Sequence, residues 1–340
     1  MLEKNPVISV KNLNKEIGNH RILNDISFSV CSGEILGIIG HSGSGKSTLL
    51  RCLDFLISPT SGSISIAGFH NSSAKEKISR SDFAKRVAYI SQNGGLFLAK
   101  TVFENIAYPL KIRYPEMTKS LIEEKVNEAL HFLNLYERKH AYPSRLSGGQ
   151  KQKAAIAIAI VSDPQVLLCD EITSALDPRS TEDITDKLLQ LNEERGITQV
   201  FVSHEIEVIK KLCTHTLVMH QGNIEELGPA DKLFLNPYSS ITEELFHMNS
   251  IAKGIYDHNE NEEILRLGFP KGLAVQGMIS QLIQGGQISI NILSGDINLF
   301  RKIPLGFLII VLSGEKKLRD RAKDILIGKG VIVQKFQKSR

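Results

Sequence analysis

Short apolar runs alternate with longer amphipathic stretches along the first 240 residues of this chain. Runs such as Ile35–Ile39, Gln165–Cys169 and Thr198–Ser203 have the length and the apolar character of buried strands. Between such runs, the stretch Asp183–Arg195 carries apolar residues at helical spacing. This alternation predicts an α/β fold in which helices cover a parallel sheet.

Two segments of this first part depart from the simple alternation. Val7–Val10 and Arg21–Val30 flank the turn formers Gly18-Asn19-His20, which predicts two strands ahead of the first buried one. Leu121–Leu133 has apolar residues at helical spacing and falls between the two halves of the alternation. We therefore expect an inserted helical subdomain.

The pattern changes after residue 240. Residues 241–262 are helix-compatible in part and then polar and acidic, which predicts a linker between a first domain at 1–240 and a second at 263–338. The second domain has the order strand, helix, strand, strand, helix, strand, which predicts a ferredoxin-like α+β fold. Its six elements are expected at Ile264–Phe269, Leu273–Gln284, Gln287–Leu293, Phe307–Leu312, Lys316–Ile327 and Val331–Phe336.

Composition and charge argue against several classes of protein. A formal net charge of +4 over 340 residues provides no general basic field, so we expect no nucleic-acid partner. The longest apolar stretches, Ala154–Val161 and Leu305–Leu312, are much shorter than the roughly 20 residues that cross a bilayer. Residues 1–6 lack a hydrophobic signal region, so the chain is expected to stay in the cytoplasm and to reach a membrane only through a partner.

The cysteines stand singly along the chain. None belongs to a C-x-x-C pair, and no group of histidines completes a metal site with them. We expect reduced thiols in the core, and Cys169, inside an apolar run, is expected to serve packing alone. The four residues are Cys31, Cys52, Cys169 and Cys213.

A Gly-rich turn follows Ile35–Ile39 and leads into the helix-like stretch Thr48–Leu53. Its glycines let backbone N–H groups converge on phosphate oxygens, and the positive end of the helix dipole adds to the attraction. Lys46 would reach the β and γ phosphates of a nucleoside triphosphate, and the Ser47 hydroxyl would ligate Mg²⁺. Such a turn can also be a plain flexible loop, but the strand before it and the helix after it favour a phosphate site. The turn comprises Gly40, His41, Ser42, Gly43, Ser44, Gly45, Lys46 and Ser47, and Thr48 follows it.

Two carboxylates, Asp170 and Glu171, follow the buried run Val166–Cys169. They stand at the carboxyl end of a strand, where ligands of open α/β sheets gather. Asp170 would hold the Mg²⁺, and Glu171 would polarise the water that attacks the γ-phosphate. An isolated Asp-Glu pair is more often a pair of solvated acids, but a phosphate cradle already requires a residue that holds the metal.

Four further motifs occur in a specific order. Ser147, Gly148, Gly149 and Gln150 precede a helical stretch, which offers a second anion site at a helix N-terminus. The segment 174–177 follows Glu171, while Gln92 and His204 each follow a predicted strand. Taken singly, Gln92 would be an ordinary loop residue and His204 an ordinary hydrogen-bonded histidine.

With these motifs, about the first 235 residues resemble the ATP-binding cassette (ABC) ATPases. The resemblance implies a P-loop NTPase core that binds ATP and Mg²⁺ and forms a head-to-tail homodimer. Ser147 and Gly149 of one subunit would face the γ-phosphate that Lys46 of the other subunit holds. His204 would contact the γ-phosphate, and Gln92 would sense the nucleotide and its metal. Adenine is expected to pack on Ile17, where many relatives use an aromatic ring.

The second domain carries a resemblance of its own. Asn291–Ile297, Pro304–Gly306 and Leu312–Gly314 are similar to the regulatory NIL domain of methionine-importer ATPases, and Leu168–Pro178 is close to the same subfamily. This implies the energy-coupling subunit of an importer, peripheral on the cytoplasmic face of the cell inner membrane. Its partners would be permease subunits and an extracytoplasmic solute-binding protein. Methionine bound to paired C-terminal domains would inhibit transport by holding the ATPase halves apart.

Other functions stay open at this point. The same cassette could serve an importer of another amino acid or small solute, or a non-import system such as lipoprotein release, although the latter does not account for the C-terminal domain. A soluble cassette protein working on DNA or ribosomes would usually join two cassettes or carry a coiled-coil or strongly basic insert, and this sequence shows one cassette and neither insert.

Overall fold

The computed structural model describes most of the chain. Within the described part, no helix combines the length and the apolar character needed to cross a membrane. Contacts divide the chain into two compact units, Met1–Val208 with Leu217–Ile224, and Ile209–Thr216 with Glu225–Arg340. The described residues are 6–72, 78–92, 94–246, 261–270, 273, 277, 279, 288–301 and 303–335.

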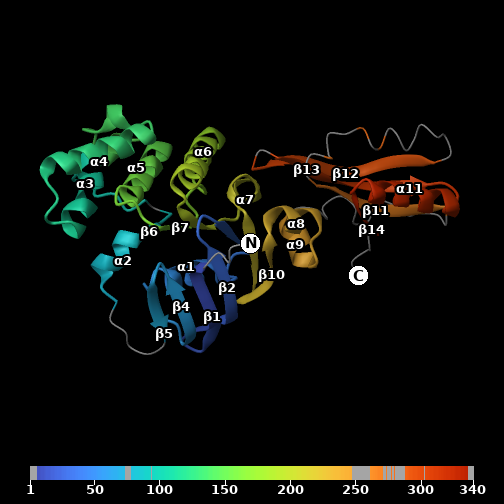
Figure 1. Cartoon of the computed structure of the whole chain (residues 1–340), viewed down its shortest axis with the longest axis horizontal. Helices are drawn as coiled ribbons and strands as arrows, with labels where there is room; N and C mark the ends of the chain where they lie inside the picture. Colours follow the sequence, from blue (N-terminus) through green and yellow to red (C-terminus); the bar gives the residue numbers. More distant parts are fainter. Residues whose placement is uncertain are drawn as a thin grey trace. The chain divides into compact units, whose positions relative to one another are not determined.

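A six-stranded sheet carries the predicted α/β alternation, and Figure 1 labels β6, β7 and β10 among its strands. The strand order is β10-β9-β3-β8-β7-β6. The neighbours β3 and β8, β8 and β7, and β7 and β6 are parallel. Every residue of β3, β7 and β8 is buried, as expected for parallel strands that helices cover on both faces. The strands are β3 (Ile35–Ile39), β6 (Val87–Ile90), β7 (Val166–Asp170), β8 (Thr198–Val202), β9 (His215–His220) and β10 (Asn223–Pro229).

A separate antiparallel sheet of order β2-β1-β4-β5 accounts for the predicted N-terminal strands. Its first two strands are longer than the apolar pattern indicated, because register shifts between β1 and β2 accommodate polar residues within the ladder. Asn12 is one of these residues and has a φ of 46°. The strands are β1 (Pro6–Ile17), β2 (His20–Cys31), β4 (Ser61–Ile66) and β5 (Phe69–Ser72).

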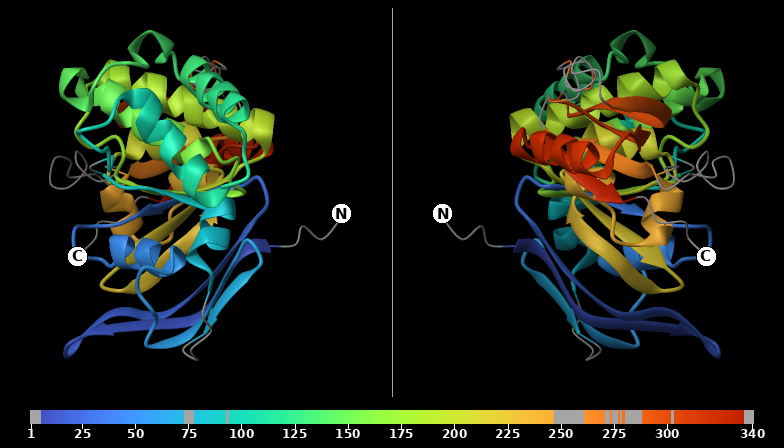
Figure 2. Two further views of the ribbon diagram at one scale, coloured as in Figure 1. Left: turned by 90° about the vertical axis from the view of Figure 1, so that its left-hand side faces the viewer. Right: turned by 90° about the vertical axis from the view of Figure 1, so that its right-hand side faces the viewer.

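Three helices, α3, α4 and α5, contact one another and form a group apart from the antiparallel sheet (Figures 1 and 2). This confirms the predicted helical subdomain, and α4 coincides closely with the predicted stretch Leu121–Leu133. Each of the three begins at a side-chain cap, Thr101, Thr118 or Ser147. The helices of the first part of the chain are α1 (Lys46–Leu53), α2 (Arg80–Arg86), α3 (Val102–Arg113), α4 (Lys119–Phe132), α5 (Gly148–Ile160), α6 (Pro178–Arg195) and α7 (Ile206–Leu212), with single 3₁₀ turns at Tyr136–Arg138 and Pro143–Arg145.

The second unit contains an antiparallel sheet of order β12-β13-β11-β14. Its described elements agree with the predicted order of the ferredoxin-like domain, except that the helix expected at Leu273–Gln284 lies almost wholly outside the described residues. Leu265, Leu267 and Ile310 form the centre of its apolar core with Leu326 of α11. The elements are α8 (Ala230–Leu235), α9 (Ser240–Leu245), β11 (Glu262–Phe269), β12 (Ser289–Phe300), β13 (Ile303–Ser313), α11 (Lys316–Gly328) and β14 (Ile332–Lys335).

None of the four cysteines is joined to another in a disulfide bond. Cys52, Cys169 and Cys213 are buried, and Cys31 is half-buried. Burial raises the pKa of the Cys52 thiol to about 11, so it stays protonated at neutral pH. Cys52, Cys169 and Cys213 therefore behave as core residues.

Candidate active site

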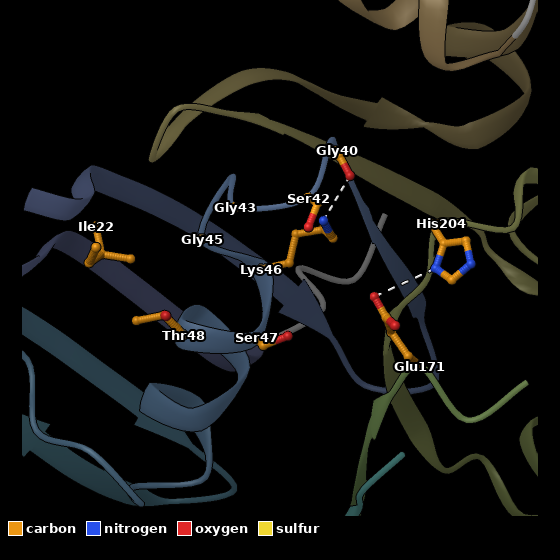
Figure 3. A pocket seen from close by; sticks show the side chains of 10 residues that line it. All are labelled: Ile22, Gly40, Ser42, Gly43, Gly45, Lys46, Ser47, Thr48, Glu171 and His204. Carbon is orange, nitrogen blue, oxygen red and sulfur yellow. Dashed lines mark hydrogen bonds and ion pairs between the residues drawn. The ribbon is translucent and has the colours of Figure 1, made fainter. Parts of the chain in front are cut away.

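The loop between β3 and α1 borders a cavity of about 540 Å³. At Gly40 a Cβ atom would overlap the carbonyl oxygen of Met219, and at Gly45 it would lie 2.9 Å from that of Ile22. Gly45 also has a φ of 103°, a left-handed conformation that favours glycine. The lining residues are Ile22, Gly40, Ser42, Gly43, Gly45, Lys46, Ser47, Thr48, Glu171 and His204 (Figure 3).

The helix α1 begins beside this cavity. Its first N–H groups have no acceptor within the helix, and its dipole places partial positive charge at the same end. The Lys46 ammonium group adds a full charge and is held within the loop, where its Nζ donates to the carbonyl oxygens of Gly40 (2.7 Å) and His41 (2.9 Å). Burial lowers the pKa of Lys46, while the carboxylates of Glu171 and Asp170 act in the opposite direction. The cavity is therefore suited to a polyanion.

Asp170 connects this loop to the end of β7. Ser47 Oγ donates to Asp170 Oδ1 at 3.2 Å, and Tyr89 Oη donates to Asp170 Oδ2 at 2.8 Å. Burial, reinforced by the hydrogen bond to Asp170, raises the pKa of Tyr89, so its hydroxyl keeps its proton at neutral pH. No motif in the sequence points to Tyr89 as part of this site.

Ser47 and Asp170 fit a magnesium ion. Mg²⁺ prefers oxygen ligands and is commonly held by one or two side chains together with substrate phosphates and water. Among the described residues no group of three or more His, Cys, Asp and Glu could hold a metal by itself. A site that is shared with the phosphates is consistent with both observations.

Glu171 and His204 meet on the other wall of the cavity (Figure 3). His204 Nδ1 lies 3.6 Å from Glu171 Oε1, an ion pair when the imidazole is protonated. Glu171 has a φ of 48°, and its N–H donates to the carbonyl oxygen of Val202 at 3.0 Å. Left-handed backbone at a residue other than glycine costs free energy and often marks a functional position.

Further hydrogen bonds fix the loops that carry these two residues. Thr173 Oγ1 donates to Glu205 Oε1 at 2.9 Å, which joins the loop after β7 to the loop after β8. Gln92 Nε2 donates to Ser174 Oγ at 3.1 Å, and Ser174 Oγ donates to the Glu171 carbonyl oxygen at 2.9 Å. Gln92 is thus linked to the Glu171 backbone, although it does not line the cavity.

The residues Ser147, Gly148, Gly149 and Gln150 also do not line the cavity of their own chain. Ser147 and Gln150 form a capping box at the start of α5, because each side chain accepts from the backbone N–H of the other. A Cβ atom at Gly149 would lie 2.7 Å from Ser180 Oγ, so glycine allows α5 to approach α6. The motif therefore has a structural role within the chain and presents a second helix N-terminus.

The residue next to the cavity on the N-terminal sheet is Ile22, which the sequence analysis did not propose. Ile17, the residue proposed for adenine contact, is not among the lining residues and has an exposed fraction of 54%. Ile22 lies on β2 close to Gly45, and this juxtaposition depends on how the N-terminal sheet approaches the loop. No pattern along the sequence signals it.

Both parts of the chain match known protein families. Residues 23–174 match the ABC transporter family, and residues 263–335 match the NIL domain family. Among solved structures, the dimeric ATP-binding cassette MJ0796 bound to ADP and Pi has a TM-score of 0.59 and 30% identity, covering 66% of this chain and 98% of that chain. The cbiO1 subunit of the cbiONQ ABC transporter from Clostridium perfringens has a TM-score of 0.62 and 26% identity, covering 68% and 91%.

Several relatives match over their full length. The methionine import ATP-binding protein MetN of Chlamydia caviae is 82% identical over 341 residues, with 100% of both chains covered. The protein of the same name from Chlamydia pneumoniae is 62% identical, with 98% of this chain and 99% of the relative covered. That of Clostridioides difficile is 39% identical, with 96% and 98% covered. The chain therefore belongs to the ABC transporter ATPases and, within them, to the family of methionine import ATP-binding proteins.

Proposed function

We propose that this chain is the ATP-hydrolysing, energy-coupling subunit of an importer whose cargo is methionine. The proposal is carried by full-length identity of 82% to a methionine import ATP-binding protein. It agrees with the chemistry of the site, since Lys46, Asp170, Glu171 and His204 are present together beside the phosphate loop.

The site residues receive the following roles in this proposal. Lys46 and the N–H groups at the start of α1 bind the phosphates of ATP. Ser47 and Asp170, with Gln92, would hold Mg²⁺, which when bound neutralises charge on the phosphate oxygens. Glu171 accepts a proton from the attacking water, and His204, 3.6 Å away, contacts the γ-phosphate.

The proposal includes a homodimer of ATPase subunits. The cavity of one chain is not lined by that chain's own motif Ser147, Gly148, Gly149 and Gln150. In the proposed dimer, the second copy would bring its motif to this cavity. The solved cassette MJ0796, which is dimeric with ADP and Pi, supports this arrangement. Two ATP molecules would then hold the two subunits together, and hydrolysis would let the subunits separate.

The C-terminal part of the chain is proposed to regulate transport. We assign residues 1–240 to the ATPase domain, 241–262 to the linker and 263–338 to the regulatory domain, which contains the NIL match at 263–335. Methionine bound there would favour the open dimer and so inhibit hydrolysis. Within the second unit, Asp296 of β12 is paired with Lys210 of α7, the helix that begins two residues after His204. This pair offers a physical connection between the two functions.

Uptake and hydrolysis in a purified complex test the function. The chain is expected to copurify with permease subunits, peripheral on the cytoplasmic face of the cell inner membrane. Reconstituted with the extracytoplasmic binding protein, the complex should take up radiolabelled methionine in the presence of ATP and Mg²⁺. Preferential uptake of another solute, or release of lipoproteins, would contradict the proposal.

Regulation needs a separate measurement on the intact chain. A truncation from Glu263 onward would expose Phe234, whose ring packs on Phe300 and Phe307 with centroids 4.9 and 5.6 Å apart. We therefore favour calorimetric titration of the full chain with methionine, and with leucine as the control. Methionine, and not leucine, should bind and should slow ATP hydrolysis over the same concentration range.

A further inference from the structure

The hydroxyl of Tyr89 reaches the carboxylate that is proposed to hold the metal, from a neighbouring strand. Tyr89 on β6 is paired with Leu168 on β7, and Asp170 lies two residues further along β7. Paired residues of adjacent strands share a face of the sheet, as do residues two apart on one strand. The strand register therefore brings the Tyr89 and Asp170 side chains to one face, where their oxygens lie 2.8 Å apart.

The two oxygens of Asp170 have different partners. Oδ2 accepts from Tyr89 at 2.8 Å, while Oδ1 accepts from Ser47 at 3.2 Å, so the shorter bond is the one to the tyrosine. A carboxylate with one oxygen held by a fixed donor cannot rotate freely about its Cβ–Cγ bond. Asp170 is also buried, with an exposed fraction of 8%, so water cannot easily replace the tyrosine hydroxyl.

We propose that Tyr89 is a positioning residue for the metal ion of the ATPase reaction. By holding Oδ2, it turns Oδ1 of Asp170 toward Ser47, where the ion and the phosphates are expected. The inference rests on the proposed metal role of Ser47 and Asp170. Groups that orient a metal ligand typically change metal affinity or activity by about 10–100-fold when they are removed.

The test is the substitution Tyr89→Phe in the full-length chain, which deletes one oxygen and keeps the ring. Mn²⁺ binding in the presence of ADP is followed by electron paramagnetic resonance, and ADP binding in EDTA is measured separately. We expect the Kd for Mn²⁺ to rise about tenfold, with metal-free ADP affinity unchanged. The Mg²⁺ concentration for half-maximal hydrolysis should rise by the same factor. Tyr238→Phe is the matched control, because Tyr238 has an exposed fraction of 88%.

Two comparisons keep the result unambiguous. Ser47→Ala should weaken Mn²⁺ binding if the metal site is correctly assigned. If Ser47→Ala weakens binding and Tyr89→Phe does not, the positioning role is refuted while the metal site stands. If neither variant changes Mn²⁺ affinity, the site and the inference both fail. Tyr89→Phe could also lower the stability of the chain, so the unfolding temperature is measured with ADP alone and with ADP plus Mg²⁺. The increase caused by Mg²⁺ should be smaller in Tyr89→Phe than in the wild type, and an equal increase would refute the role.

Discussion

His204 Nδ1 lies 3.6 Å from Glu171 Oε1 at the cavity beside the phosphate loop. The two residues follow β8 and β7, which are neighbours in the parallel sheet. A hydrogen bond between Thr173 and Glu205 ties their loops together. The Glu171 carboxylate therefore lies on the wall of the same cavity that the phosphate loop borders, which is the position that the proposed general base requires.

The first prediction concerns this carboxylate. Glu171→Gln keeps the size of the side chain but removes its capacity to accept a proton, so kcat for ATP should fall by about 10²–10⁴-fold. ATP affinity should remain within about twofold, since the phosphate loop is unchanged. Steady-state hydrolysis and binding of a fluorescent ATP analogue measure the two effects. Glu137→Gln, at an exposed position, serves as the control, and hydrolysis near the wild-type rate in Glu171→Gln would exclude the proposed base.

The second prediction separates two roles of Ser147. Its hydroxyl caps α5, and in the proposed dimer it also faces the phosphate of the other subunit. Aspartate is an equally good N-cap, but it would place a negative charge against ATP. Ser147→Asp should therefore keep the unfolding temperature within about 2 °C and yet lose at least about tenfold in hydrolysis. If the variant hydrolyses ATP normally, the motif acts only as a helix cap.

The sequence indicates which candidate residues lie near one another where each of them directly follows a buried strand. The phosphate loop, Asp170 and Glu171 follow buried strands, and the ends of parallel strands converge at one edge of a sheet. Tyr89 and Ile22 could not be identified in this way. Tyr89 reaches Asp170 through strand register, and Ile22 lies near Gly45 through packing of a separate sheet. Neither contact produces a pattern of residues in the sequence from which it could be predicted.

Element boundaries show the same limit. The apolar pattern ended the first strand at Val10, but β1 continues to Ile17 because bulges keep its polar residues paired with β2. The strand predicted to end at Leu293 continues to Phe300, because β13 provides partners along its whole length. Pairing energy between strands thus overrode local composition in both sheets.

The third prediction concerns pH and Asp54, at the C-terminal end of α1. Burial raises the pKa of this carboxyl to about 6, although Arg80, with its Nη2 3.5 Å from Oδ2, opposes the change. The folded chain therefore binds the proton more tightly than the unfolded chain does. Stability falls as the pH rises from about 4 to about 6, and the cost persists above that range.

Asp54→Asn should remove this dependence. Relative to the wild type, the variant should gain unfolding free energy between pH 4 and pH 7, on the order of 2–3 kcal/mol. Urea unfolding followed by circular dichroism at several pH values measures the difference. Asp82→Asn provides a control of opposite sign, because hydrogen bonds from Lys85 and Ser79 lower the pKa of that exposed carboxyl. A constant difference across the pH range would show that Asp54 does not titrate as inferred.

The last prediction concerns Lys210 and Asp296 in the second unit. Lys210 Nζ lies 3.0 Å from Asp296 Oδ2 and 4.7 Å from the centre of the Phe234 ring. The lysine side chain is 4% exposed and that of the aspartate 41%. Removing the carboxylate would take a partner away from a lysine whose side chain is almost wholly buried, which costs more than losing a pair on the surface.

Asp296→Ala should lower the unfolding free energy by about 1–3 kcal/mol, between the values for exposed and fully buried pairs. Lys210→Met keeps the contact with Phe234 and removes the charge, so in that background Asp296→Ala should cost less than about 1 kcal/mol. Urea unfolding of the four proteins completes the double-mutant cycle. Inhibition of ATP hydrolysis by methionine is measured on the same four proteins. The reason is that Asp296 lies in the NIL match, while Lys210 follows His204 by six residues in the chain. If Asp296→Ala lowers the unfolding free energy equally in the wild-type and the Lys210→Met backgrounds, the two side chains have no interaction energy. The pair could not then couple methionine binding to ATP hydrolysis.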